Sequence, residues 1–179
     1  MNRGIGVSGA LAALSLAMIC SVGASSAETA RPRVLPDGEI MAKKDDPEMR
    51  AAEDKARRTL GEFIKAFDAD IGDVDDPPEF AVNIPITDDD GNTENVWVIY
   101  LSRDGDEFTG SIANEPAVVK NITYGQEVTF SKDRIVDWHY TTDGKMRGSF
   151  TTCVILSRED PEKARKAKIA MGLTCDDGV

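Results

Sequence analysis

The stretch "FAVNIPITDDDGNTENVWVIYL", residues 80–101, has the pattern of two β-strands joined by a turn. Apolar residues alternate with others in its first half, at Phe80, Val82, Ile84 and Ile86, as in a strand that buries one face. The segment "DDDGN" has the composition of a turn. The second half is apolar on both faces, with Trp97, Ile99 and Leu101 on one and Val96, Val98 and Tyr100 on the other. This second half therefore predicts a central strand that is covered on both sides. The first strand is predicted to lie at an edge of the sheet, because Pro85 has no N–H to donate.

Further strand patterns follow this pair. A third strand is predicted, and its inward face carries Phe108, Gly110 and Ile112. Residues 126–130 and 134–141 form the next predicted hairpin. The pattern then predicts a last strand, one face of which carries Phe150, Thr152, Val154 and Leu156.

Helical patterns flank the strands. Residues 46–67 place apolar side chains at helical spacing after the start signal Asp46-Pro47-Glu48. Residues 160–171 repeat this start signal and predict a shorter helix. The predicted fold is therefore α+β, with an N-terminal amphipathic helix, an antiparallel bent sheet or partial barrel of about six strands, and a short C-terminal helix.

The start of the chain predicts export. Residues 1–27 combine a positive start, an apolar run and small residues, as in a secretory signal peptide cleaved after Ala27 or after Ala24. The alternative for this segment is an uncleaved membrane anchor. We expect residues 28–44 to be a flexible leader, 45–171 a single domain and 172–179 a tail. The protein would then be periplasmic or secreted, with no membrane span after signal removal.

Charge and cysteine content restrict the partners. The formal net charge of −11 opposes binding to the phosphate backbone of nucleic acids. After signal removal two cysteines remain, Cys153 and Cys175, and an oxidising compartment favours a disulfide between them over two free thiols. Such a bridge would tie the C-terminal tail to the predicted last strand.

Signals for cofactors and metals are weak. The sequence has no glycine-rich phosphate loop and no dinucleotide fingerprint, so we expect no cofactor. The acidic segment from Asp68 to Glu79 partly resembles a calcium loop, but Gly72 and Asp73 stand where a ligand and a glycine are required. We expect no metal site there.

The segment from Asn114 to Tyr140 concentrates the residues that could carry chemistry. With a period of two, Trp138 faces the core, and Asp137 and His139 share the opposite face. A carboxylate beside an imidazole can support acid–base catalysis, although strands also carry such polar pairs on a solvent face. His139 is the only histidine, which excludes a multi-histidine metal centre.

Several motifs, in this order, resemble the YegJ-like bacterial family known as domain of unknown function 2314. They include "GNTENVWV", "FTGSIANEP", "YGQEVTF" and "IVDWHY", and the resemblance covers roughly residues 45–156. It implies one compact domain, often exported, with a signature made of Trp97, Asn114-Glu115-Pro116, Gly125 and Asp137-Trp138. It implies no established activity. The sequence departs from the family at Asn95, where a histidine is usual, and at Cys153, where a basic residue is usual.

The leading functional hypothesis is a non-enzymatic, exported domain that binds a protein or peptide partner in the cell envelope. The binding residues would be Asn114, Glu115, Lys120, Asp137 and His139. A first alternative is a small hydrolase or transferase that uses Asp137, His139 and Glu115, which requires these groups within hydrogen-bond reach. A second alternative is an envelope-maintenance protein without a small ligand.

Overall fold

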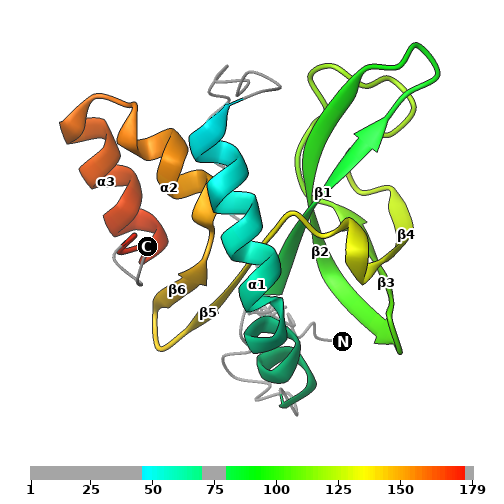
Figure 1. Cartoon of the computed structure of the whole chain (residues 1–179), viewed down its shortest axis with the longest axis horizontal. Coiled ribbons are helices and arrows are strands. Elements are labelled where there is room, and N and C mark those ends of the chain that lie inside the picture. Colours follow the sequence, from blue (N-terminus) through cyan, green and yellow to red (C-terminus); the bar gives the residue numbers. More distant parts are fainter. Residues whose placement is uncertain (1–45, 70–79, 176–179) are drawn as a thin grey trace, which may run out of the picture. The chain divides into compact units, whose positions relative to one another are not determined.

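The computed structural model describes residues 46–69 and 80–175 and shows an α+β fold, as predicted (Figure 1). Its six strands form one open antiparallel sheet in the order β4-β3-β2-β1-β5-β6. The elements in chain order are α1 (Pro47–Ala69), β1 (Phe80–Thr87), β2 (Thr93–Asp104), β3 (Glu107–Ile112), β4 (Glu127–Ser131), the 3-10 helix η1 (Lys132–Arg134), β5 (Asp137–Thr142), β6 (Lys145–Gly148), α2 (Phe150–Ser157) and α3 (Pro161–Met171). The predicted signal peptide, the leader and most of the acidic segment after Asp68 lie outside the described residues.

Helix α1 begins where the sequence predicts. The Asp46 carboxylate accepts hydrogen bonds from the N–H groups of Glu48 and Met49, at 3.0 and 3.2 Å, and so caps the first turn. The buried face of the helix includes Ala56 and Phe63, and these side chains face the sheet. The Trp138 indole N–H donates to the carbonyl oxygen of Ala56 at 2.9 Å, which fixes α1 against β5.

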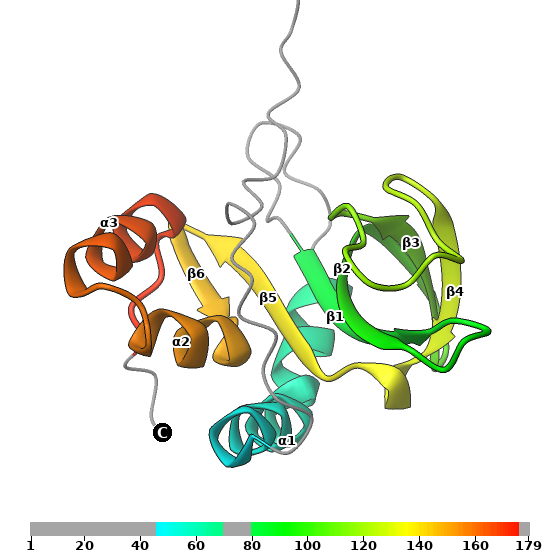
Figure 2. The same cartoon turned by 90° about the horizontal axis from the view of Figure 1, so that it is seen from above.

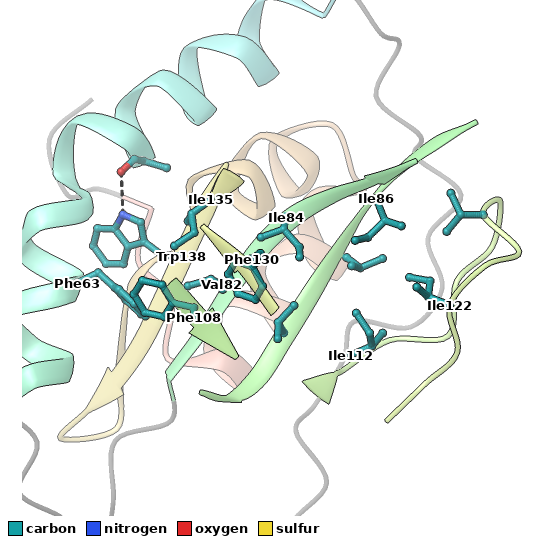
Figure 3. Close-up of a cluster of buried hydrophobic side chains, with 14 residues drawn as sticks. Phe63, Val82, Ile84, Ile86, Phe108, Ile112, Ile122, Phe130, Ile135 and Trp138 are labelled. Atoms are coloured by element: carbon teal, nitrogen blue, oxygen red, sulfur yellow. Dashed lines mark hydrogen bonds between the residues drawn. The ribbon is translucent and has the colours of Figure 1, made fainter. Parts of the chain in front are cut away.

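One hydrophobic cluster joins α1 to the sheet (Figure 3). Phe63, Val82, Ile84, Phe108 and Trp138 all lie in it, with 0 to 2% of their surface exposed. Val119 and Ile122, from the loop between β3 and β4, also belong to it. Trp138 is therefore a core residue, as the alternation of β5 predicts.

The prediction that β1 is an edge strand is wrong, because β1 lies between β2 and β5. Pro85 is tolerated there because β5 pairs with β1 only from Phe80 to Asn83. Beyond that point η1 leads the chain away, and Arg134 donates a side-chain hydrogen bond to the Pro85 carbonyl. The missing proline N–H thus falls where no strand pairs with it.

The predicted faces of β2 are correct only in part. Val96 and Val98 are buried, but Tyr100 is 74% exposed. Between the pairs Ile99↔Ser111 and Ser102↔Thr109, two residues of β2 stand opposite the single residue Gly110, which is a β-bulge. A Cβ on Gly110 would lie 2.7 Å from the Ile99 carbonyl oxygen, so the bulge requires glycine there.

The predicted last strand is wrong: residues 150–157 form helix α2. The strand that follows the turn is β6, and Gly148 and Ser149 then take positive φ angles of 82° and 59° that end it. A Cβ on Gly148 would also lie 2.1 Å from the Trp138 carbonyl oxygen. The N-terminus of α2 is capped by a side chain distant in sequence, Asp137, which no local pattern reveals.

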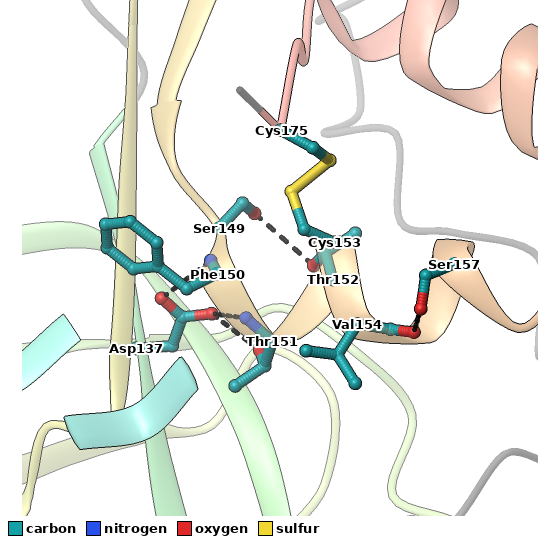
Figure 4. The surroundings of a disulfide bond; sticks show 9 residues. All are labelled: Asp137, Ser149, Phe150, Thr151, Thr152, Cys153, Val154, Ser157 and Cys175. Atoms are coloured by element: carbon teal, nitrogen blue, oxygen red, sulfur yellow. Dashed lines mark hydrogen bonds between the residues drawn. A yellow bond between two sulfur atoms is a disulfide. The ribbon is translucent and has the colours of Figure 1, made fainter. Parts of the chain in front are cut away.

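The expected disulfide between Cys153 and Cys175 is present, although it starts from a helix and not from a strand (Figure 4). It closes a segment of 22 residues, for which the chain-entropy account gives about 3 kcal/mol of stabilisation. It also joins α2 to the segment after α3, whose Leu173 packs with Met146 and Leu156 in a second hydrophobic cluster. No helix in the described part of the chain is long and apolar enough to cross a membrane.

Candidate functional site

Asp137 lies at the junction of β5 and α2 and is fully buried, so the face of β5 opposite Trp138 is not a solvent face at this residue. Its Oδ1 accepts hydrogen bonds from the N–H groups of Trp138 and Phe150, at 2.8 and 3.2 Å. Its Oδ2 accepts from the Thr151 N–H at 2.8 Å and from the Thr151 hydroxyl at 2.5 Å (Figure 4). Burial raises the pKa of Asp137 to about 6, although these four hydrogen bonds act to lower it. The carboxylate thus serves as a helix cap.

His139 lies on the same side of the sheet as Ala81, its partner in the β1–β5 register. The imidazole contacts the Trp97 indole, with 4.7 Å between the ring centroids. Because Trp97 is on β2 and His139 on β5, the two rings meet across β1, and the small Ala81 leaves room for them. Burial lowers the pKa of His139 to about 4, so the imidazole is neutral at pH 7.

Asn83 occupies the same face of β1, between Trp97 on β2 and Asp137 on β5. It is buried, and its Oδ1 has no hydrogen-bond partner among the described residues. The same holds for the His139 Nδ1. A buried polar atom without a partner is costly, and this face of β1 and β5 carries two such atoms.

The loop between β3 and β4 is fastened to the sheet by two side chains. The Asn114 Oδ1 accepts a hydrogen bond from the Trp97 N–H at 2.8 Å. The Glu94 carboxylate accepts from the N–H groups of residues 117 to 119, at 2.8 to 3.2 Å. Asn114 and Glu94 therefore fix the loop, and sequence reasoning missed Glu94 because its partners are backbone groups of a distant loop.

The other predicted binding residues lie at the surface. Glu115 is exposed, and Lys120 is exposed with its Nζ 4.0 Å from the Asp90 carboxylate. Within the described residues no hydrogen bond or ion pair links Glu115, Asp137 and His139. The Asp137 carboxylate, which would orient His139, instead accepts hydrogen bonds from the N-terminus of α2. The geometry therefore lacks the pair of a base and an orienting carboxylate that acid–base catalysis uses.

The described residues contain no group of three histidine, cysteine or acidic side chains placed to hold a metal ion. Asp68 lies near the end of α1, and its carboxylate binds the Arg103 guanidinium at 2.7 Å. That pair joins α1 to β2.

The strand half of the domain carries the most distinctive surface. Residues 80–148 contain 12 acidic and 6 basic side chains, so they carry −6 of the formal net charge of −11. Two tyrosines are exposed on this half, Tyr100 at 74% and Tyr124 at 53%. Tyr100 also has a φ of 53°, which costs conformational energy in a non-glycine residue. The bulge thus holds an aromatic side chain outward.

Comparisons with known proteins agree with the resemblance seen in the sequence. The chain is 36% identical over 109 residues to "Uncharacterized protein YegJ" of Escherichia coli (strain K12), a match that covers 61% of this chain and 67% of that protein. It is 28% identical over 136 residues to "Putative ankyrin repeat protein" of Neisseria meningitidis serogroup B (strain ATCC BAA-335 / MC58), covering 74% of this chain but only 54% of that relative. No solved structure matches the chain significantly.

The family described as "Uncharacterized protein conserved in bacteria (DUF2314)" matches residues 46–175. This range takes in α1, the whole sheet, α2, α3 and both cysteines of the disulfide. The chain therefore belongs to the DUF2314 family.

Proposed function

We propose that this protein is an exported domain that binds a protein or peptide partner in the cell envelope. The observation that carries the proposal is Tyr100, an exposed tyrosine held outward by a β-bulge and a positive φ angle. Bulges frequently redirect a side chain next to a functional site, and tyrosine is enriched in protein interfaces. The strained backbone keeps this ring on the surface, where a partner can cover it.

Charge supports the same surface. The acidic excess of residues 80–148 surrounds Tyr100 and Tyr124 in sequence and favours a partner with basic side chains. The name of the N. meningitidis relative agrees with a role in protein binding, because ankyrin repeats build extended binding surfaces. The disulfide suits an oxidising compartment.

Export gives the first expected result. When the full chain is produced in a bacterial host, we expect the periplasmic or secreted fraction to contain protein that begins at Glu28, or at Ser25 if cleavage follows Ala24. Intact-mass spectrometry measures the new N-terminus and, from the absence of free thiols, the disulfide. Uncleaved protein in the membrane fraction would favour the membrane anchor over a cleaved signal peptide, and uncleaved protein in the cytoplasmic fraction would contradict export.

Partner binding is tested by photo-crosslinking in the envelope fraction. We expect a photoreactive amino acid at position 100 or 124 to give a crosslinked product of discrete mass. The matched control is position 169, because Ile169 on α3 is also exposed, at 68%, but lies outside the acidic strand half. Equal crosslinking from all three positions, or none from any of them, would reject a partner surface on the strand half.

A further inference from the structure

Strand β4 ends the sheet, and one side of its backbone faces no other strand of the described residues. The Lys132 N–H donates to the Asp106 carbonyl at 2.8 Å, and the Ile112 N–H donates to the Gln126 carbonyl at 2.9 Å. The direction of backbone hydrogen bonds alternates along a strand. The register therefore points the N–H and C=O groups of Val128 and Phe130 toward β3. The N–H and C=O groups of Glu127 and Thr129 point away from β3.

This outer edge is open to solvent. Glu127, Thr129 and Ser131 are all exposed, and no backbone group in residues 46–69 or 80–175 pairs with the outward groups of Glu127 or Thr129. Figure 2 shows β4 at the end of the sheet that lies away from α2 and α3. The opposite edge is different, because Met146 of β6 bridges to Leu173 and its N–H donates to the Gly172 carbonyl at 3.0 Å.

The geometry points to the β4 edge as the place where an extended, basic peptide segment of a partner adds a seventh strand to the sheet. This inference rests on the proposed partner-binding function and specifies its mode. Main-chain hydrogen bonds to an open edge supply affinity in this type of recognition, and alternate side chains supply specificity.

The charges at the β4 edge indicate which kind of peptide segment would bind there. Exposed edges are protected by charged side chains, often lysine, and by proline. The only charged side chain of β4 is Glu127, and the strand has neither lysine nor proline, so the charge at this edge is negative. Lys132, just beyond, is engaged with the Asp106 carboxylate at 2.8 Å. Neither Glu127 nor Glu107, which lie on the same face of the sheet, has a cation partner in the part of the chain described.

A second copy of this chain would add further glutamates, Glu107 and Glu127, to this edge but no lysine or arginine within β4 to pair with them. A segment with lysine or arginine at alternate positions would instead place positive charge opposite Glu127. Tyr124 precedes the strand by three residues and is exposed, so it offers an aromatic contact near the N-terminal end of β4.

Thr129→Pro is the decisive variant. Proline there removes an N–H that points outward, so the pairing of β4 with β3 stays intact while the edge loses its central donor. The matched control is Thr129→Ala, which loses the same side-chain contact to Thr109, 2.9 Å between the hydroxyl oxygens, but keeps the N–H. The probe is a synthetic ten-residue peptide of alternating lysine and valine, compared with a glutamate–valine peptide and with a basic peptide methylated on alternate backbone nitrogens.

Titration calorimetry is expected to show equal affinity of the basic peptide for wild type and Thr129→Ala, within about two-fold, and at least about ten-fold weaker binding to Thr129→Pro. Glu127→Lys is expected to weaken the basic peptide several-fold. Wild type is expected to bind the methylated and glutamate peptides at least about ten-fold more weakly than the basic one. The methylated peptide tests the edge without any change to the protein, so the inference stays testable if Thr129→Pro does not fold.

The inference is overturned if Thr129→Pro binds the basic peptide as wild type does, or if wild type binds none of the peptides. It is also overturned if wild type dimerises in sedimentation experiments and Thr129→Pro does not, because the occupant is then a second copy. Crosslinking from positions 100 and 124 that persists in Thr129→Pro would leave the proposed function standing while rejecting the edge.

Discussion

Asp137→Ala is expected to lower the free energy of unfolding by about 3–5 kcal/mol. The substitution leaves the N–H groups of Trp138, Phe150 and Thr151 without their acceptor, and the Thr151 hydroxyl also loses its partner. Removing a buried carboxylate relieves its desolvation cost, so the loss is smaller than four separate hydrogen bonds would give. Chemical denaturation at pH 7.5, monitored by tryptophan fluorescence, measures the difference.

Two control variants separate the roles of the carboxylate oxygens. Thr151→Val removes only the hydroxyl donor to Oδ2 and is expected to cost about 1 kcal/mol. Asp137→Asn keeps one acceptor oxygen and should fall between Thr151→Val and Asp137→Ala. If Asp137→Ala costs less than about 1 kcal/mol, Asp137 does not hold α2 against the sheet, and its burial needs another explanation.

Local signals in the sequence were sufficient for the helices that begin with their own caps. Asp46-Pro47-Glu48 and Asp160-Pro161-Glu162 start α1 and α3 where predicted, and Asp160 accepts hydrogen bonds from the N–H groups of Glu162 and Lys163. The alternation of residues 80–86 likewise located β1. In each case the signal that predicts the element lies within the element or next to it in the sequence.

Non-local geometry explains the failures. Residues 150–156 fit a period of two, but they fold as α2 because Asp137, on another strand, caps the helix. Tyr100 is exposed because Gly110, on β3, admits a bulge. The sequence therefore predicts correctly the elements that are determined by residues close in the chain. It fails where a residue on a distant strand decides the structure, as Asp137 of β5 does for α2 and Gly110 of β3 does for Tyr100.

The candidate site shows the same limit. Asp137 and His139 do lie on one face of β5, as alternation predicted, but burial and the α2 N-terminus decide what each of them does. His139 meets Trp97 across β1, where Ala81 is the register partner of His139 and Asn83 that of Trp97. Neither the contact nor the partnerless Asn83 Oδ1 follows from spacing along the chain. The open edge of β4 can be recognised only when the strand order is known, and the sequence does not predict that order.

The opposite pKa shifts of Asp137 and His139 give the last prediction. The pKa of Asp137 rises from 3.8 to about 6, so the folded state holds a proton that the unfolded state has lost, and stability falls as the pH rises through this window. The pKa of His139 falls from 6.5 to about 4, so the unfolded state binds the extra proton, and stability rises as the pH rises from 4 to 6.5. In wild type these two contributions nearly cancel.

Single variants should expose the two slopes. Between pH 4.5 and 6.5, Asp137→Asn is expected to gain about 2–3 kcal/mol of stability as the pH rises, because only His139 then titrates in this window. His139→Gln is expected to lose a similar amount, because only Asp137 remains. The pKa values of Asp46, Asp88 and Glu162 are lowered from their ordinary values of 3.8, 3.8 and 4.5, so these carboxyl groups change protonation largely below this pH range. Urea denaturation at five pH values gives all three curves. Parallel curves for wild type and both variants would show that neither group changes its pKa on folding. Opposite slopes would establish that the fully buried Asp137 and the half-buried His139 titrate in opposition, so that their contributions offset each other in the mildly acidic range.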